Sequence, residues 1–127
     1  MRKVAIAATD APPAIGGYAQ ALKVESARAL VFVSGQVPVD TAGQTPSDFA
    51  GQCRLVWRNV EAQLRAAGLR LDDIVKVTTF LADRGDADAN GAIRREMLGS
   101  HAPALTVVFA GVFEQDWKLE IEVIAAA

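Results

Sequence analysis

Two glutamates one residue apart, Glu120 and Glu122, are the first side chains in this sequence that could do chemistry. They lie in a segment of alternating polarity that predicts a strand over residues 117–125, with both carboxylates on one face, roughly 6.5–7 Å apart. Such a pair can divide the roles of general acid and general base. Taken alone, the pair is more typical of a solvated strand face balanced by Lys118. Partial burial in a cleft between subunits would favour the catalytic interpretation, because desolvation raises the pKa of a carboxyl group.

Two further segments carry groups that could hold a ligand. Tyr18 follows two glycines in a loop, where its phenol could donate a hydrogen bond to a ligand or simply anchor the loop. Ser34 and Gly35 end a buried strand, where glycine permits close approach to a ligand and free amides can bind an oxyanion or carboxylate. This is not a G-x-S-x-G nucleophile elbow, and His101 is the only histidine, so we do not expect a serine hydrolase.

Four other reactive residues have more ordinary interpretations. His101 precedes Ala-Pro at a helix-to-strand turn and is typical of a capping or surface residue. Cys53 falls on the apolar stripe of a predicted helix and indicates an inert core position. Arg94 and Arg95 lie on a second predicted helix, either on a solvated face or as guanidinium groups that bind an anion near the pocket.

The composition excludes several classes of protein. The 127 residues are 51% hydrophobic and 22% charged, which excludes a disordered chain. The net charge of −2 argues against a protein that grips a nucleic-acid backbone. With one cysteine, no intrachain disulfide can form, and no Cys/His cluster indicates a structural metal. No apolar run reaches membrane-span length, and the stretch after Met1 is too short for a signal peptide, so we expect a cytoplasmic protein.

Periodicity and punctuation predict one domain over residues 1–127 with the order β-β-β-α-β-α-β-β. The predicted strands cover residues 3–8, 18–23, 28–34, 74–82, 105–110 and 117–125, and the predicted helices cover residues 47–67 and 88–98. Right-handed β-α-β crossovers place both helices on one face of a single mixed sheet, giving an α+β fold. The other face would then be uncovered, and its partly apolar character indicates association with another chain.

The helix over residues 47–67 is the strongest local prediction. Ser47 or Asp48 supplies a side-chain cap, and Gly68 follows where a left-handed residue is expected. The apolar stripe consists of Phe49, Cys53, Val56, Val60, Leu64 and Ala67. The helix over residues 88–98 has a thinner apolar face, formed by Ala89, Ile93 and Met97.

Six segments together resemble the Rid family, also called the YjgF-type or enamine/imine deaminase family. In order, they are residues 11–20 (APPAIGGYAQ), 33–37 (VSGQV), the helix from Ala50 through Asn59 to Gly68, 73–78 (DIVKVT), 103–107 (PALTV) and 119–122 (LEIE). The resemblance covers nearly the whole chain. It implies a chorismate-mutase-like fold and a homotrimer with a small-molecule cleft between neighbouring subunits. It also implies hydrolysis of reactive enamines and imines to 2-keto acids and ammonia, with no metal or organic cofactor.

The same resemblance assigns roles to individual residues. Tyr18 matches the family's pocket tyrosine, Ser34 and Gly35 the ligand contact at a strand end, and Glu120 the carboxylate that holds or activates water. Asn90 matches the pocket asparagine, although the segment that follows it is about two residues shorter than in the family.

The main departure from the family is Leu105, which stands where deaminating members have the arginine that clamps the substrate carboxylate. Leucine cannot make charge-assisted hydrogen bonds, and with Val107 it would give the cleft an apolar floor. Two interpretations remain: a divergent hydrolase or deaminase with a less polar substrate, in which Arg94 or Arg95 could relocate the anion clamp, or a non-catalytic trimer that binds a metabolite or a protein. We do not expect the ribonuclease activity attributed to some relatives, because the chain is acidic and lacks a pair of histidines.

Overall fold

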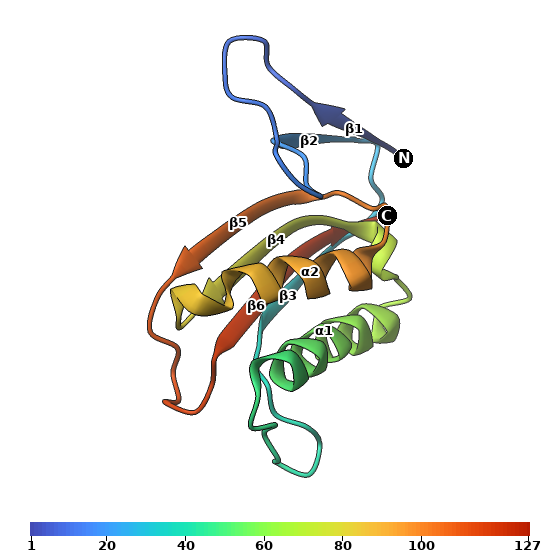
Figure 1. Ribbon diagram of the computed structural model, residues 1–127. Coiled ribbons are helices and arrows are strands. Elements are labelled where there is room, and N and C mark those ends of the chain that lie inside the picture. The colour runs from blue at the N-terminus through green and yellow to red at the C-terminus, as the bar shows by residue number, and fades with distance from the viewer.

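The computed structural model describes all 127 residues. It has six strands and two α-helices, and Figure 1 shows how they are arranged. In chain order the elements are β1 (Arg2–Ile6), β2 (Ala21–Glu25), β3 (Leu30–Gln36), α1 (Phe49–Ala66), β4 (Ile74–Leu81), α2 (Ala87–Leu98), β5 (Ala104–Phe109) and β6 (Leu119–Ala126), with 3-10 turns at Leu71–Asp73 and Arg84–Asp86. The predicted order of elements is therefore confirmed. The largest boundary difference is the start of β2, at Ala21.

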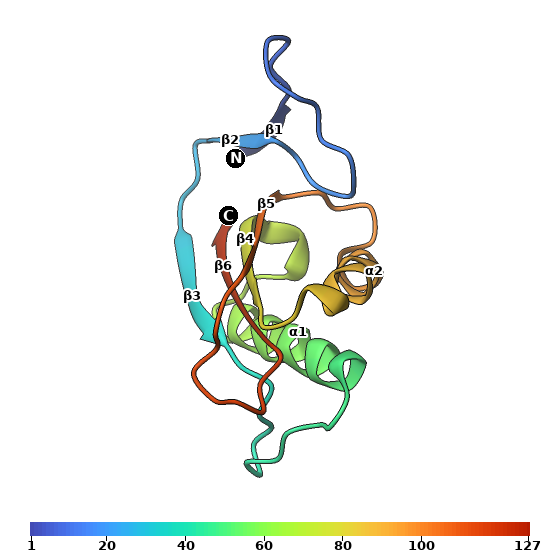
Figure 2. The same cartoon turned by 60° about the vertical axis from the view of Figure 1, so that its left-hand side comes forward.

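Four strands form one mixed sheet in the order β3-β6-β4-β5. β6 pairs antiparallel with β3 and with β4, whereas β4 and β5 are parallel and are joined by the crossover through α2. Both helices lie on the same side of this sheet, and the opposite side carries no element (Figure 2). Two helices on one face of a mixed sheet confirm the predicted α+β class.

The first two strands do not join that sheet, which corrects the prediction of a single sheet. β1 and β2 pair only with each other, as an antiparallel hairpin that projects beyond the ends of β4 and β5 (Figure 1). Two contacts hold it there: Ala19 forms a parallel bridge with Ala104, and the Lys3 ammonium donates to the carbonyl of Asp72. Sequence periodicity could not predict this arrangement, because it reports which residues form a strand but not which edge that strand joins.

α1 buries the predicted stripe with one exception. Phe49, Cys53, Val56, Val60 and Leu64 are buried, whereas Ala67 lies beyond the end of the helix and is exposed. Gly68 has the expected left-handed backbone, with φ of 79°. Asp48 occupies the N-cap position, but its side chain makes no capping hydrogen bond, so the predicted side-chain cap is wrong.

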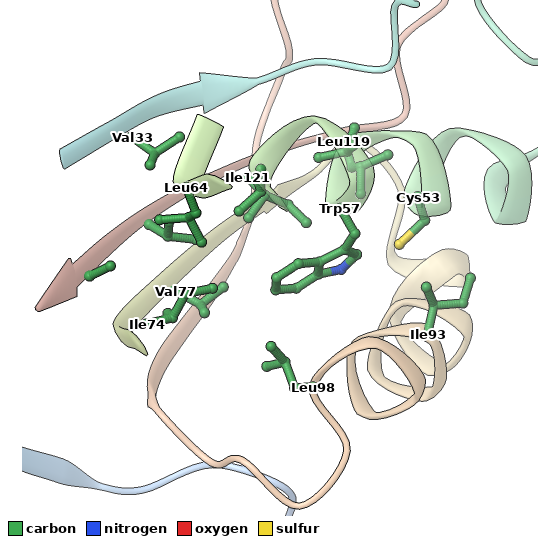
Figure 3. Packing of buried hydrophobic residues seen from close by; sticks show 14 of the residues in the cluster. Val33, Cys53, Trp57, Leu64, Ile74, Val77, Ile93, Leu98, Leu119 and Ile121 are labelled. Atoms are coloured by element: carbon green, nitrogen blue, oxygen red, sulfur yellow. The ribbon is translucent and has the colours of Figure 1, made fainter. Parts of the chain in front are cut away.

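The hydrophobic core fills the space between the helices and the sheet (Figure 3). Trp57 of α1 lies at its centre, between Ile93 and Leu98 of α2 and the buried side chains of β4 and β6. Burial of this indole and its neighbours supplies the main driving force for folding, at roughly 25 cal/mol per Å² of apolar surface. Neither helix is long and apolar enough to cross a membrane.

Gln52 is a buried polar residue that ties α1 to the segment before β6. Its amide nitrogen donates to the carbonyl oxygens of Pro46 and Asp116, each at 2.9 Å, and its amide oxygen accepts from the backbone N–H of Lys118 at 2.8 Å. All three partners are backbone groups in loops. Gln52 therefore anchors the chain at Lys118, directly before β6 and two residues before Glu120.

Candidate functional site

Glu120 lies on the uncovered face of the sheet, near the start of β6. Its chain neighbours Leu119 and Ile121 point into the core, which confirms the alternation predicted for this strand. Glu120 is half buried, whereas Glu122 is exposed on the same face. The two carboxylates of the predicted pair therefore have different environments.

Gly35 of β3 packs directly against the Glu120 carboxylate. A Cβ atom on Gly35 would lie within 2.6 Å of the Glu120 carboxyl carbon and still closer to Oε2, so a side chain at this position excludes the observed rotamer. β3 also changes register with β6 between Val33 and Gln36. Irregularities of this kind re-aim neighbouring side chains. The end of β3 thus sets the position of the Glu120 carboxylate.

Ser34 lies beside a polar cleft on the same uncovered side of the sheet. It lines a shallow cleft of about 280 Å³ together with Glu122, Lys76 and Thr78. The ammonium of Lys76 is already engaged, because it donates to Thr106 Oγ1 at 2.6 Å. The uncovered face therefore carries Ser34, Gly35 and Glu120.

Three other candidates meet on the helix side of the sheet. Tyr18, Asn90 and Val107 line an open cavity of about 510 Å³ between the glycine loop, α2 and the edge strand β5. The Tyr18 hydroxyl lies 3.5 Å from the amide N–H of Ile15 in its own loop. Asn90 is buried, and its side-chain oxygen has no hydrogen-bond partner. This cavity is the larger of the two sites and contains unsatisfied polar atoms.

Arg94 lines the same cavity and is buried, which excludes the solvated-face interpretation for this residue. Only 7% of its surface is exposed, and its Nε has no hydrogen-bond partner. Burial, reinforced by the charge of Arg95, lowers the pKa of the Arg94 guanidinium. Arg95 is exposed, as the solvated interpretation requires.

α2 buries most of the predicted apolar face, because Ile93 is in the core and Met97 packs against it. Ala89 is exposed, while Asn90 and Arg94 are buried alongside Ile93 and Leu98. Asn90 and Arg94 are four residues apart and so share a helix face. This spacing in the sequence could have indicated that the two residues lie together. It was missed because an apolar-face pattern does not include polar residues.

Leu105 and Val107 point to the helix side of β5, and both pack against the core. Only Val107 lines the cavity within one chain. Leu105 pairs with Val77 of β4 and contributes to the core, so within one chain it does not form a cleft floor.

His101 and Cys53 have structural positions. His101 Nε2 lies 2.7 Å from the carbonyl oxygen of Ile74 and links the turn after α2 to the start of β4. Cys53 is fully buried, and burial raises the pKa of its thiol to about 12, partly offset by the charge of Arg54. Cys53 is therefore the inert core residue that the sequence predicted.

The candidate residues form two groups on opposite sides of the sheet. Ser34, Gly35 and Glu120 lie on the uncovered face, whereas Tyr18, Asn90 and Val107 lie on the helix side. A single chain does not bring the two groups together. No group of three or more histidine, cysteine, aspartate or glutamate side chains in the structure is arranged to hold a metal ion.

Comparison with known proteins places this arrangement in context. The 2-iminobutanoate/2-iminopropanoate deaminase of Salmonella typhimurium is 39% identical over 94% of both chains. The crystal structure of Escherichia coli TdcF with bound serine is 38% identical, covers 98% of both chains and superposes with a TM-score of 0.74. The Rid-family protein YyfB of Yersinia pestis is 22% identical and shares the fold over the full length of both chains, with a TM-score of 0.87.

A family model described as endoribonuclease L-PSP matches residues 8–127. The match leaves out only residues 1–7, which include β1. Together with the relatives above, it shows that this chain belongs to the endoribonuclease L-PSP family, also known as the Rid or YjgF family, and has its chorismate-mutase-like fold.

Proposed function

We propose that this protein is a reactive-intermediate deaminase, which hydrolyses an enamine or imine to a 2-keto acid and ammonia in the cytoplasm without a metal or organic cofactor. The Salmonella relative is a deaminase of 2-iminobutanoate and 2-iminopropanoate, which supports this reaction class. The observation that carries the proposal is the Glu120 carboxylate, half buried and seated against Gly35 on an otherwise uncovered face.

In the proposed reaction Glu120 acts as a general base on water. As the water oxygen bonds to the imine carbon, its proton passes to the carboxylate and the C=N electron pair moves to nitrogen. The protonated glutamate then returns the proton to nitrogen. The carboxylate then carries the hydroxyl proton to nitrogen, and the C=O bond forms as the C–N bond breaks, which releases the 2-keto acid and ammonia. A positioned carboxylate in this role contributes typically 10²–10⁴-fold to rate.

We propose that the complete site forms between subunits of a homotrimer. Tyr18, Asn90 and Val107 of one subunit would lie opposite Glu120 of its neighbour, which joins the two groups that one chain keeps apart. The uncovered face supports this arrangement, because Phe32 there is 70% exposed and lies opposite Ile124 across the β3–β6 pair. A contiguous exposed apolar patch is typical of an association surface.

The test is to generate 2-iminopropanoate in situ and follow release of the 2-keto acid. We expect wild type to exceed the background rate, and Glu120→Gln to lose at least a hundredfold. Glu122→Gln is the matched control, because Glu122 lies on the same strand face and is exposed. A wild-type rate at background, or a Glu120→Gln variant as active as wild type, would contradict the proposal.

Leu105 favours a second candidate function, a non-catalytic trimer that binds a metabolite or a protein. Its side chain contributes to the core and supplies no charge for a substrate carboxylate. In this case wild type binds a small ligand but does not turn over the imine, and a Leu105→Arg variant that gained turnover would show that the rest of the site is intact. We do not extend the family's endoribonuclease description to this chain, because its net charge is −2 and His101, its one histidine, contacts a backbone carbonyl.

A further inference from the structure

The guanidinium group of Arg94 is buried but has no protein partner. It forms no ion pair with any carboxylate in the structure and donates no hydrogen bond, and its Nε is sealed from solvent. The one carboxylate that lines the cavity, Asp88, is exposed at the start of α2 and forms no ion pair. The neighbouring charge that most affects the pKa of Arg94 is that of another cation, Arg95, which lowers it.

An arginine in this position is destabilising unless something neutralises it. A buried charge is tolerated when it is paired and hydrogen-bonded, and arginine remains protonated at physiological pH. The cavity at Arg94 is open to solvent on one side, so an anion can reach it. A group from outside the chain therefore can provide the missing partner.

The other groups around this cavity fit a small carboxylate. Tyr18 carries a hydroxyl donor, and Asn90, which also lines the cavity, has an amide nitrogen that is a donor by its chemistry. The first turn of α2, at Ala87 and Asp88, also lines the cavity, so the positive end of a 12-residue helix is close by. The planar fork of a guanidinium matches a carboxylate in geometry as well as in charge.

We propose that Arg94 binds the carboxylate of a small 2-keto or 2-imino acid in this cavity and supplies from α2 the cation that position 105 lacks. The identity of the acid rests on the proposed function, because such acids are the substrates and products of the deaminase reaction. The cation lies on a helix rather than on β5. The alternative view, in which the substrate of this protein carries no carboxylate, requires Arg94 to remain unpaired.

The experiment measures binding without turnover. We titrate the protein with 2-oxopropanoate and, separately, with its neutral amide, by calorimetry. Wild type is expected to prefer the acid at least tenfold, and Arg94→Gln is expected to abolish that preference. Arg58→Gln is the matched control, since Arg58 is exposed on α1 and does not line this cavity. Equal binding of the acid by wild type and Arg94→Gln, or no preference in wild type, overturns the inference.

A measurement on wild type covers the case in which Arg94→Gln does not fold. The Nε–H resonance of the buried Arg94 is followed by NMR, and it is expected to shift with 2-oxopropanoate but not with the amide. An unchanged resonance overturns the inference. Binding that depends on Arg94 without any turnover would refute the proposed deaminase activity and leave this inference intact. Turnover that is unaffected in Arg94→Gln would refute this inference and leave the proposed deaminase activity intact.

A separate observation concerns the free edges of the molecule. β3 pairs with β6 on one side and has no partner on the other, and β2 is likewise unpaired on the side away from β1. The exposed edge strand carries Leu30, which is 57% exposed, and Phe32. Long exposed edges with apolar side chains template pairing with another chain.

The chain's own hairpin does not cover that edge. The Ala19–Ala104 bridge and the Lys3–Asp72 contact hold it at the ends of β4 and β5 instead. This placement is supported by the YyfB crystal structure. A TM-score cannot exceed the fraction of residues that superpose, and residues 26–127, which exclude the hairpin, are about four-fifths of the chain. The observed TM-score of 0.87 therefore requires the hairpin to superpose as well.

We infer that the hairpin of one copy adds its β2 edge to β3 of a second copy. The test places one cysteine on β2, Lys23→Cys, and one on β3, Leu30→Cys or Phe32→Cys, in separately prepared chains that are then mixed and oxidised. A disulfide between the two chains is expected, and Cys53 does not compete because it is buried. Absence of the mixed disulfide with both β3 variants overturns the inference. A doubly substituted chain that closes only within itself would also overturn it, since its hairpin then folds back onto its own β3.

Discussion

At the scale of the residue, one contact controls the position of the Glu120 carboxylate. Gly35 lies so close to Glu120 that only glycine leaves room for the observed rotamer. The sequence predicted both residues as site candidates, but it could not predict that they touch, because that contact depends on the register of β3 against β6. Arg94 shows the same limit: its burial depends on how α2 packs in the folded chain, including against α1, which no local pattern reports.

Gly35→Ala is expected to lower enzymatic activity while leaving the stability of the fold nearly unchanged. The added methyl group forces the flexible Glu120 side chain to rotate, so we expect turnover of 2-iminopropanoate to fall at least tenfold. The free energy of unfolding should change by less than about 1 kcal/mol, because the far end of a half-exposed side chain can move at little cost. Gly111→Ala is the control, since nothing lies within 4 Å of the position its Cβ would take. Unchanged turnover in Gly35→Ala would show that the position of Glu120 does not matter.

At the scale of the element, α1 does more than cover the sheet. Its predicted stripe was correct except at Ala67, because a 3.6-residue period reports which face is buried. The period did not identify Gln52, a polar residue beside the stripe that is 1% exposed. Its burial depends on loops far along the chain, so the signal lies outside the helix.

Gln52→Leu is expected to destabilise the fold by about 2–4 kcal/mol. The change leaves the Lys118 N–H and the carbonyls of Pro46 and Asp116 without their partner, and each buried unsatisfied group costs roughly 1–3 kcal/mol. Denaturant unfolding measures the loss. Gln63→Leu, at an exposed position of the same helix, should stay within about 0.5 kcal/mol of wild type. Equal effects of the two variants would mean that the Gln52 hydrogen bonds contribute nothing net.

Cys53 on the same helix gives a prediction about pH. Because the folded-state pKa is raised from 9.0 to about 12, the folded protein keeps the thiol proton after the unfolded chain has lost it. The contribution of the Cys53 thiol to the free energy of unfolding should therefore be complete below pH 9. Above pH 9 the free energy of unfolding should fall by up to about 1.4 kcal/mol per pH unit. Cys53→Ala should show a shallower decline between pH 9 and 11 than wild type. Parallel declines in the two proteins would contradict the raised pKa.

At the scale of the whole molecule, the α+β architecture was predictable because alternating and helical periods follow one another clearly along the chain. The separation of the hairpin from the sheet was not, because a strand pattern does not specify its partner. The uncovered face was predictable from the topology alone. What covers it depends on a second chain, and the location of Glu120 on that face makes assembly a condition for the proposed activity.

Phe32→Glu tests that condition. Phe32 is 70% exposed and stands opposite Ile124 on the uncovered face, so a charge there would be buried without a partner wherever two copies meet. We expect wild type to have a mass in solution of about three times 13.4 kDa, and the variant to dissociate and lose turnover of 2-iminopropanoate. Phe113→Glu is the control, because Phe113 is 88% exposed in the loop before β6 and should leave both mass and turnover unchanged. A variant that becomes monomeric yet remains fully active would show that one chain contains the complete site. A variant that remains assembled would place the interface elsewhere on the molecule.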